Sequence, residues 1–185
     1  MGKMRKTTSG GFDLVQGILA KPPTNIPNAI GEVYKRELTI LRALNLQAFK
    51  ELLGDDGSLT IKVNVWSLPD VDRFFGDGAS PHNHPWPFKS MIISGSYTED
   101  RYRLVDNVIE RETKTYQAGD INEMPADTFH LVTEVIPGTI TVMVCGTPAP
   151  GNEWGYLDLT TKQYSPAKMD PNFLDKLKEV NPHLR

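Results

Sequence analysis

The chain has 185 residues and a formal net charge of −3 at neutral pH, so its charge gives no general attraction to nucleic acid or anionic lipid. Its composition is that of an ordinary globular domain, and its single cysteine excludes an internal disulfide framework and a cysteine-based zinc site. The sequence shows no secretory signal pattern and no apolar run of membrane length, so we expect a cytoplasmic protein without membrane or nucleic-acid partners.

The first part of the chain, residues 1–57, is expected to be an arm and a helical subregion packed on the main domain. Residues 1–27 are rich in Gly, Pro, Thr and Lys and are typical of an irregular arm. Apolar residues then recur at helical spacing, which predicts helices within 28–54. The apolar positions of the first helix are Ile30, Val33, Leu38, Leu41 and Leu44. Because this part holds no histidine or cysteine, we expect it to be scaffold or dimer surface without a metal ligand.

Residues 58–160 are predicted to form a domain of strands. Apolar and polar residues alternate from Leu59 to Trp66, the pattern of a half-buried strand. Turn signals such as Ser94-Gly95 separate further strand-like runs at 88–105, 108–117, 121–124, 129–136, 139–145 and 154–159. Many short strands with Gly and Pro turns predict a sandwich or barrel. The tail, residues 161–185, is expected to add one short helix within 170–180.

Three of the four histidines stand in a pattern that suits a metal ion. His82 and His84 are separated by one residue, and because side chains alternate along a strand, both imidazoles are expected to point the same way. His130 follows a turn and opens the predicted strand at 129–136. Three imidazoles from neighbouring strands can hold one divalent ion and leave positions open for water or substrate. His183, near the end of the chain, is expected to lie on the surface.

These histidines lie in two stretches that resemble the two sequence motifs of the cupin superfamily. The first motif reads Gly, five residues, His-x-His, three or four residues, Glu, six residues, Gly, and its positions here are Gly76, His82-Asn83-His84, Phe88 and Gly95. The second reads Gly, five residues, Pro-x-Gly, two residues, His, three residues, Asn, and its positions here are Gly119, Pro125-Ala126-Asp127, His130 and Glu134. The resemblance covers about residues 58–160. It implies a mainly β fold, the cupin double-stranded β-helix or jelly-roll barrel, with N-terminal helices, a short C-terminal helix and one metal on the three histidines.

Three positions depart from these motifs. Asp127 replaces a turn glycine, which is tolerable because Asp can adopt left-handed backbone angles, and Glu134 replaces Asn. Phe88 replaces the metal-binding Glu and is expected to face the metal. The ligand set therefore resembles that of three-histidine cupins, a group that includes thiol dioxygenases and other iron(II) oxygenases. Three neutral imidazoles leave the ion its full charge, which favours an anionic ligand.

Residues of the strand after Gly95 are candidates for the pocket. Strand parity places Tyr97, Glu99 and Arg101 on one face, and we name these three as candidate catalytic residues. An inward Arg101 or Arg103 would suit an anionic substrate, although a solvated charged strand is an equally good interpretation.

Two further residues may be assigned by position. Trp86, two residues after His84, is a candidate for the pocket wall or for the core. Glu123, seven residues before His130, is either a hydrogen-bond partner of a metal ligand or a surface residue.

The resemblance leaves three functions open. The first is an iron(II)-dependent oxygenase or dioxygenase acting on a small polar or anionic molecule. The second is a non-redox lyase, isomerase or decarboxylase in which the ion polarises a carbonyl or carboxylate and Tyr97, Glu99 or Glu123 moves the proton. The third is a cupin that binds a ligand without catalysis. We expect one divalent ion, Fe(II) first and Zn, Mn, Ni or Co as alternatives, and a homodimer.

Overall fold

The computed structural model describes residues 23–27, 31–43, 59–70, 80–148, 150–167 and 173–184. These residues are mainly antiparallel strands. The strands are β1 (Thr24–Pro27), β2 (Val33–Ala43), β3 (Leu59–Trp66), β4 (Phe88–Ser94), β5 (Ser96–Val105), β6 (Val108–Gln117), β7 (Ile121–Met124), β8 (Phe129–Val135), β9 (Thr139–Cys145), β10 (Gly155–Leu157) and β11 (Tyr164–Pro166). The strands predicted from residue 58 onward are confirmed, with the run at 88–105 divided at Gly95 into β4 and β5.

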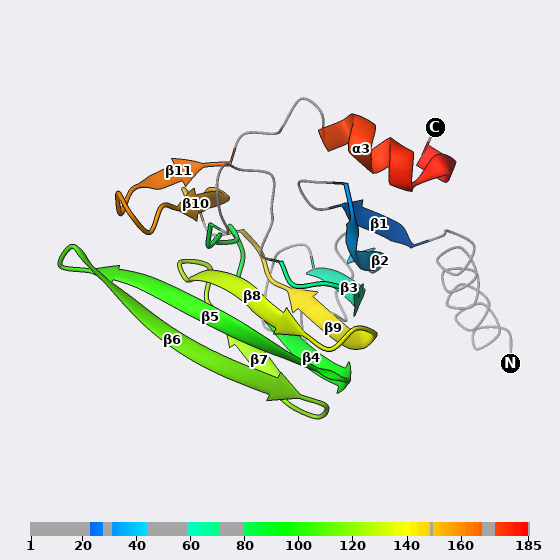
Figure 1. Cartoon of the computed structure of the whole chain (residues 1–185), viewed down its shortest axis with the longest axis horizontal. Helices are drawn as coiled ribbons and strands as arrows, with labels where there is room; N and C mark the ends of the chain where they lie inside the picture. Colours follow the sequence, from blue (N-terminus) through cyan, green and yellow to red (C-terminus); the bar gives the residue numbers. More distant parts are fainter. Residues whose placement is uncertain are drawn as a thin grey trace, which may run out of the picture.

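Two main sheets pack face to face, as a jelly-roll barrel requires (Figure 1). The larger sheet has six strands in the order β1-β2-β3-β9-β4-β7, and the smaller has three in the order β6-β5-β8. Side chains of both sheets meet in one core cluster, formed by Tyr34, Trp66, Ile92, Tyr97 and Val132. Burying side chains of this size contributes about 1.5–3 kcal/mol each. The predicted mainly β fold of cupin type is therefore confirmed.

The short segment around His82 extends the smaller sheet. His82 forms a two-way backbone hydrogen bond with His130 of β8, with N···O distances of 3.0 and 2.8 Å. On its other side the segment pairs with Tyr156 of β10, and β10 pairs with β11. This segment therefore lies between β8 and β10, so that His82 and His130 are direct cross-strand neighbours.

The helix predicted to begin near residue 28 is wrong, because residues 33–43 form strand β2, which pairs with β3 over its whole length. The side of β2 near the pocket carries Lys35 and Glu37, and these charged residues hide the period of two that an apolar inner face would show. The expected second helix, with Phe49 and Gly54, and the arm at residues 1–22 lie outside the described residues.

The turn between β4 and β5 depends on a glycine. Gly95 has a φ of +80°, and a Cβ at this position would collide with the hydroxyl of Thr139. The predicted turn at Ser94-Gly95 is therefore confirmed, and only glycine satisfies both its backbone angle and its space.

The predicted C-terminal helix is confirmed as α3 (Phe173–Val180), followed by a short 3-10 helix at Pro182–Leu184. It lies beside β1, where the amide of Asn181 donates to Asn25 O at 2.7 Å and Asn25 N donates back to Asn181 Oδ1 at 2.7 Å (Figure 1). Among the described residues, no helix has both the length and the apolar character needed to span a membrane.

Candidate metal centre

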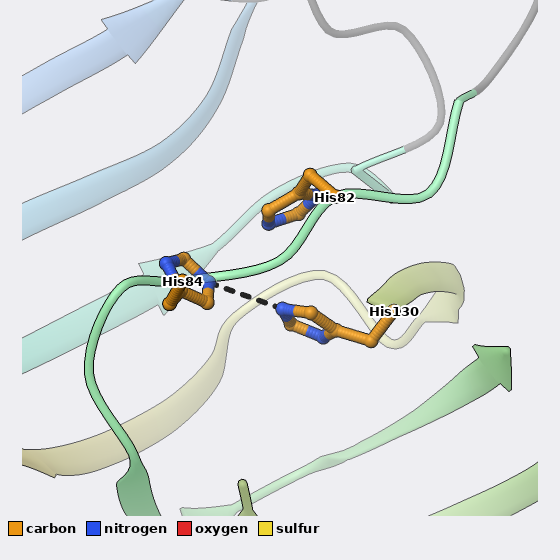
Figure 2. A group of neighbouring side chains, drawn as sticks. All are labelled: His82, His84 and His130. Carbon is orange, nitrogen blue, oxygen red and sulfur yellow. Dashed lines mark hydrogen bonds between the residues drawn. The ribbon is translucent and has the colours of Figure 1, made fainter. Parts of the chain in front are cut away.

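The three motif histidines converge at one point. Each offers one ring nitrogen to a group in which all three nitrogens lie within 4.8 Å of one another. Figure 2 shows His82 and His84 on one stretch of chain and His130 on the neighbouring strand, with a contact between the rings of His84 and His130. His82 and His130 are buried and His84 is half-buried, so the group is sheltered but open on the side of His84.

The spacing of the ring nitrogens fits one ion. His84 Nε2 and His130 Nε2 are 3.1 Å apart. Two ligands at right angles on an ion with metal–nitrogen distances of about 2.1 Å are separated by about 3.0 Å. Three imidazoles are also a donor set that suits iron, zinc, nickel and copper better than magnesium or calcium. The residues therefore fit a divalent transition-metal ion.

Phe88 lies where the cupin resemblance placed it. Its ring centroid is 5.4 Å from that of His84 and 5.7 Å from that of His130, and the side chain is buried. Met124 and Cys145 pack behind it. The expectation that Phe88 faces the three histidines is confirmed, and the position of the motif carboxylate is taken by an apolar ring that cannot ligate.

Glu99 fixes the orientation of His130. A carboxylate oxygen of Glu99 lies 3.0 Å from His130 Nδ1, so Nδ1 carries the proton and Nε2 presents its lone pair to the metal group. The same carboxylate accepts from Arg101 Nε at 2.9 Å and from Asn122 Nδ2 at 3.0 Å. With its side chain 2% exposed, Glu99 is a buried charge that is fully hydrogen-bonded.

Tyr97 and Arg101 complete this network. Asn122 Nδ2 donates to the Tyr97 hydroxyl at 2.7 Å, while the guanidinium of Arg101 donates to the hydroxyl of Tyr116 at 2.7 Å and also to Asn122. Tyr97, Glu99 and Arg101 thus share one face of β5 and point inward, as parity predicted. The alternative of a solvated strand is wrong for this face. Tyr97 and Glu99 line the pocket; whether the three residues take part in catalysis stays a prediction.

The ionisation of these groups follows from their partners. Burial alone raises the pKa of Glu99, but the hydrogen bonds and charges of His130 and Arg101 outweigh it, so the pKa is lowered and the carboxylate stays charged. Burial raises the pKa of Tyr97, and the neighbouring charge of Glu99 raises it further. The phenol of Tyr97 therefore keeps its proton across the physiological range.

The remaining candidates divide between pocket and surface. Trp86 lines the pocket with its ring 5.8 Å from that of His84, as one of its two interpretations predicted. Glu123 pairs with Lys89 on the surface at 2.8 Å, so its role as a partner of a metal ligand is wrong. Asp127 is not among the described residues with positive φ, so this turn needs no left-handed residue. His183 is exposed, as expected. Gly76 of the first motif lies outside the described residues.

Sequence reasoning missed several residues of the pocket. Asp70 is buried, with Oδ2 3.8 Å from His82 Nε2, and its position before a loop gave no motif signal. Lys35, Glu37 and Lys62 line the same pocket from β2 and β3. The expectation that residues before 58 are only scaffold or dimer surface is therefore wrong, although no metal ligand comes from the described part of this region. The pocket has a volume of about 50 Å³, and one water needs about 10–15 Å³, so the space suits a small molecule.

No family model and no curated protein matches this chain. Solved structures resemble it at low identity. KdgF from Halomonas sp. is 13% identical with a TM-score of 0.41, over 64% of this chain and 83% of that one. Oxalate decarboxylase from Bacillus subtilis is 15% identical with a TM-score of 0.46, over 76% of this chain and 31% of that one. Vicilin from Corylus avellana (hazelnut) is 13% identical with a TM-score of 0.48, over 76% of this chain and 35% of that one. The chain thus spans about a third of the latter two proteins, and at these values the comparisons assign it no activity.

Proposed function

We propose that this chain is a metal-dependent enzyme of the cupin type that holds one divalent ion on His82, His84 and His130 and acts on a small molecule. The observation that carries this proposal is the convergence of three neutral imidazoles in a sheltered pocket, with Glu99 holding one of them in the ligating tautomer. A buried carboxylate bound to the outer nitrogen of a histidine is the usual support of a metal ligand.

Iron(II) is the ion we favour, and the reaction is oxygenation of a small polar or anionic substrate. When bound, such an ion would supply redox chemistry and open coordination positions. The absence of a carboxylate at Phe88 supports an anionic substrate, because three neutral ligands leave a double positive charge to be balanced. Zinc, manganese, nickel and cobalt remain alternatives because imidazole also suits them.

The residues of the chain then have distinct tasks. Glu99 positions His130 and stays ionised. Phe88 and Trp86 cover the histidines with apolar rings, which limits the access of water and strengthens electrostatic interactions in the pocket. Arg101 compensates the charge of Glu99 and, being held by three partners, acts as a positioning residue.

Tyr97 supports a second candidate, a non-redox lyase, isomerase or decarboxylase. Its protonated hydroxyl belongs to a pocket-lining residue and can give a proton to a substrate, which is what such a reaction needs beside a Lewis-acidic ion. Replacement of Tyr97 by Phe separates the two reactions, since it would abolish proton donation while leaving the metal group intact.

The test is oxygen uptake by protein that has been stripped of metal and reloaded with iron(II) without air. With a panel of small carboxylates and thiols, we expect uptake by the wild-type protein and by His183→Ala, and none by His130→Ala. Substrate turnover without oxygen uptake would favour the non-redox candidate. Saturable ligand binding without any turnover would favour a binding protein and contradict the enzyme proposal.

A further inference from the structure

Two lysines reach the pocket from the larger sheet. Lys35 on β2 and Lys62 on β3 both line the cavity that contains the three histidines. The side chain of Lys35 is 10% exposed and that of Lys62 is 23% exposed. Lysine is almost never buried to this degree without a specific partner, so these two positions need an explanation beyond solubility.

The lysines share a carboxylate. Glu37 lies 3.0 Å from Lys62 Nζ and 3.6 Å from Lys35 Nζ. The other two acidic residues of the pocket lie near histidines, Glu99 at His130 and Asp70 at His82. At this end of the pocket, two ammonium groups therefore face one carboxylate among the lining residues.

The strand register directs this cationic pair toward the metal group. Lys62 is opposite Met143, Met143 is opposite Ser90, and Ser90 is opposite Asn122. Lys62, Met143 and Ser90 all line the pocket, and Asn122 is hydrogen-bonded to Glu99 behind His130. With strands about 4.8 Å apart, the row spans roughly 14 Å from Lys62 to Asn122.

Lys35 is held in place by aromatic rings. Its Nζ lies 5.2 Å from the centroid of Trp66 and 5.6 Å from that of Tyr34, within the range of cation–π attraction. Trp66 also stacks on Tyr97, at 6.3 Å. The ammonium group is therefore positioned on the same aromatic wall that extends to the Glu99 network.

The arginines expected to bind an anion do not serve this purpose. Arg101 donates to Glu99, Tyr116 and Asn122, and Arg103 is exposed on the strand. Among the described residues that line the pocket, the only cationic side chains other than the histidines are Lys35 and Lys62.

We infer that Lys35 and Lys62 form the substrate-anchoring site, and that the substrate is a small carboxylic acid whose carboxylate pairs with these ammonium groups while a second donor atom reaches the metal group. The inference rests on the proposed function, because the second contact requires the ion. A compound with two oxyanion groups on a short carbon chain matches both the charge and the size of the pocket.

The experiment uses the full chain loaded with cobalt(II), whose visible absorption reports on ligands near the ion. Malonate is the probe, and malonamide is its neutral counterpart. We expect malonate to bind more tightly than malonamide, and Lys35→Met and Lys62→Met each to weaken malonate about tenfold, since a hydrogen bond to a charged group contributes about 1.5–3 kcal/mol. Cobalt affinity and malonamide affinity should not change.

Two controls separate charge from packing. Lys35→Arg keeps the charge and should bind malonate within about threefold of the wild type, and Lys89→Met, on the surface pair with Glu123, should match the wild type. If Lys35→Met does not fold, the more exposed Lys62→Met decides. Cobalt bound as in the wild type with unchanged malonate affinity in the Met variants would overturn this inference alone. A protein that binds no cobalt would overturn the proposed function and the inference with it.

Discussion

Replacing Glu99 by Gln removes one charge from the most densely bonded group of the site and preserves its size. The carboxylate accepts three hydrogen bonds, one on Oε1 from Arg101 and two on Oε2 from Asn122 and His130. An amide offers one oxygen only. If that oxygen faces His130 and Asn122, the amide nitrogen faces the Nε–H of Arg101, so two donors oppose each other and the guanidinium loses its charge partner.

The cost can be worked from these contacts. Removing one partner of a buried ion pair costs about 3–5 kcal/mol. Arg101 has a side chain 13% exposed and two further acceptors, so the loss should lie near the lower end, about 3 kcal/mol. The metal is affected through His130, whose tautomer is then held by a neutral acceptor, and such a change costs about 10–100-fold in metal affinity.

The assay has two parts, denaturant unfolding of the metal-free protein and competitive titration with cobalt(II). Glu123→Gln is the matched control, because its carboxylate pairs with Lys89 at 2.8 Å but is 64% exposed; its unfolding free energy should stay within about 0.5 kcal/mol of the wild type. Metal affinity of Glu99→Gln within twofold of the wild type would refute the claim that Glu99 supports a ligand.

Three further predictions follow from other parts of the fold. Phe88→Glu places a carboxylate against His84 and His130; metal retention should rise or stay level while malonate binding and turnover fall, and unchanged affinity and turnover would contradict the position given to Phe88. Asp100→Asn tests pH dependence: burial raises the pKa of Asp100, but Thr113 and Arg111 lower it overall below its usual 3.8, so the charged form stabilises the fold above that pH and this contribution is lost as the pH falls through the lowered pKa. The wild type should therefore lose more unfolding free energy than Asp100→Asn between pH 5 and pH 3, and parallel profiles would be the contrary result. Sedimentation should give about twice the mass of the 185-residue chain if the expected homodimer forms, and a monomer mass at micromolar concentration would exclude it.

The part of the fold that sequence predicts well is the part with regular alternation and turn residues. Strands β3 to β9 were predicted because their inner positions are apolar and their turns carry Gly, Pro or Asn. Strand β2 was interpreted as a helix, because its pocket side holds Lys35 and Glu37 and its apolar residues fall by chance at helical spacing. A charged inner face is a property of the site, so local pattern reasoning fails where function overrides the core.

The metal ligands were predictable because two motifs fix their spacing, whereas their supporting residues were not. Glu99 was found by parity on β5, but its pairing with His130 depends on the register of β5 against β8. Asp70, Lys35 and Lys62 reach the pocket from loops and strands that no motif connects to it. Contacts of this kind arise from the packing of two sheets, which the order of residues along one chain does not reveal.

The central claim, that His82, His84 and His130 hold one ion without a protein carboxylate, is tested most directly by X-ray absorption spectroscopy of the iron(II)-loaded protein. The account predicts one ion per chain, scattering from three imidazoles at about 2.0–2.2 Å, and loss of the bound ion in His84→Ala and His130→Ala. An ion with fewer than three imidazole ligands, or metal content unchanged in both variants, would contradict it.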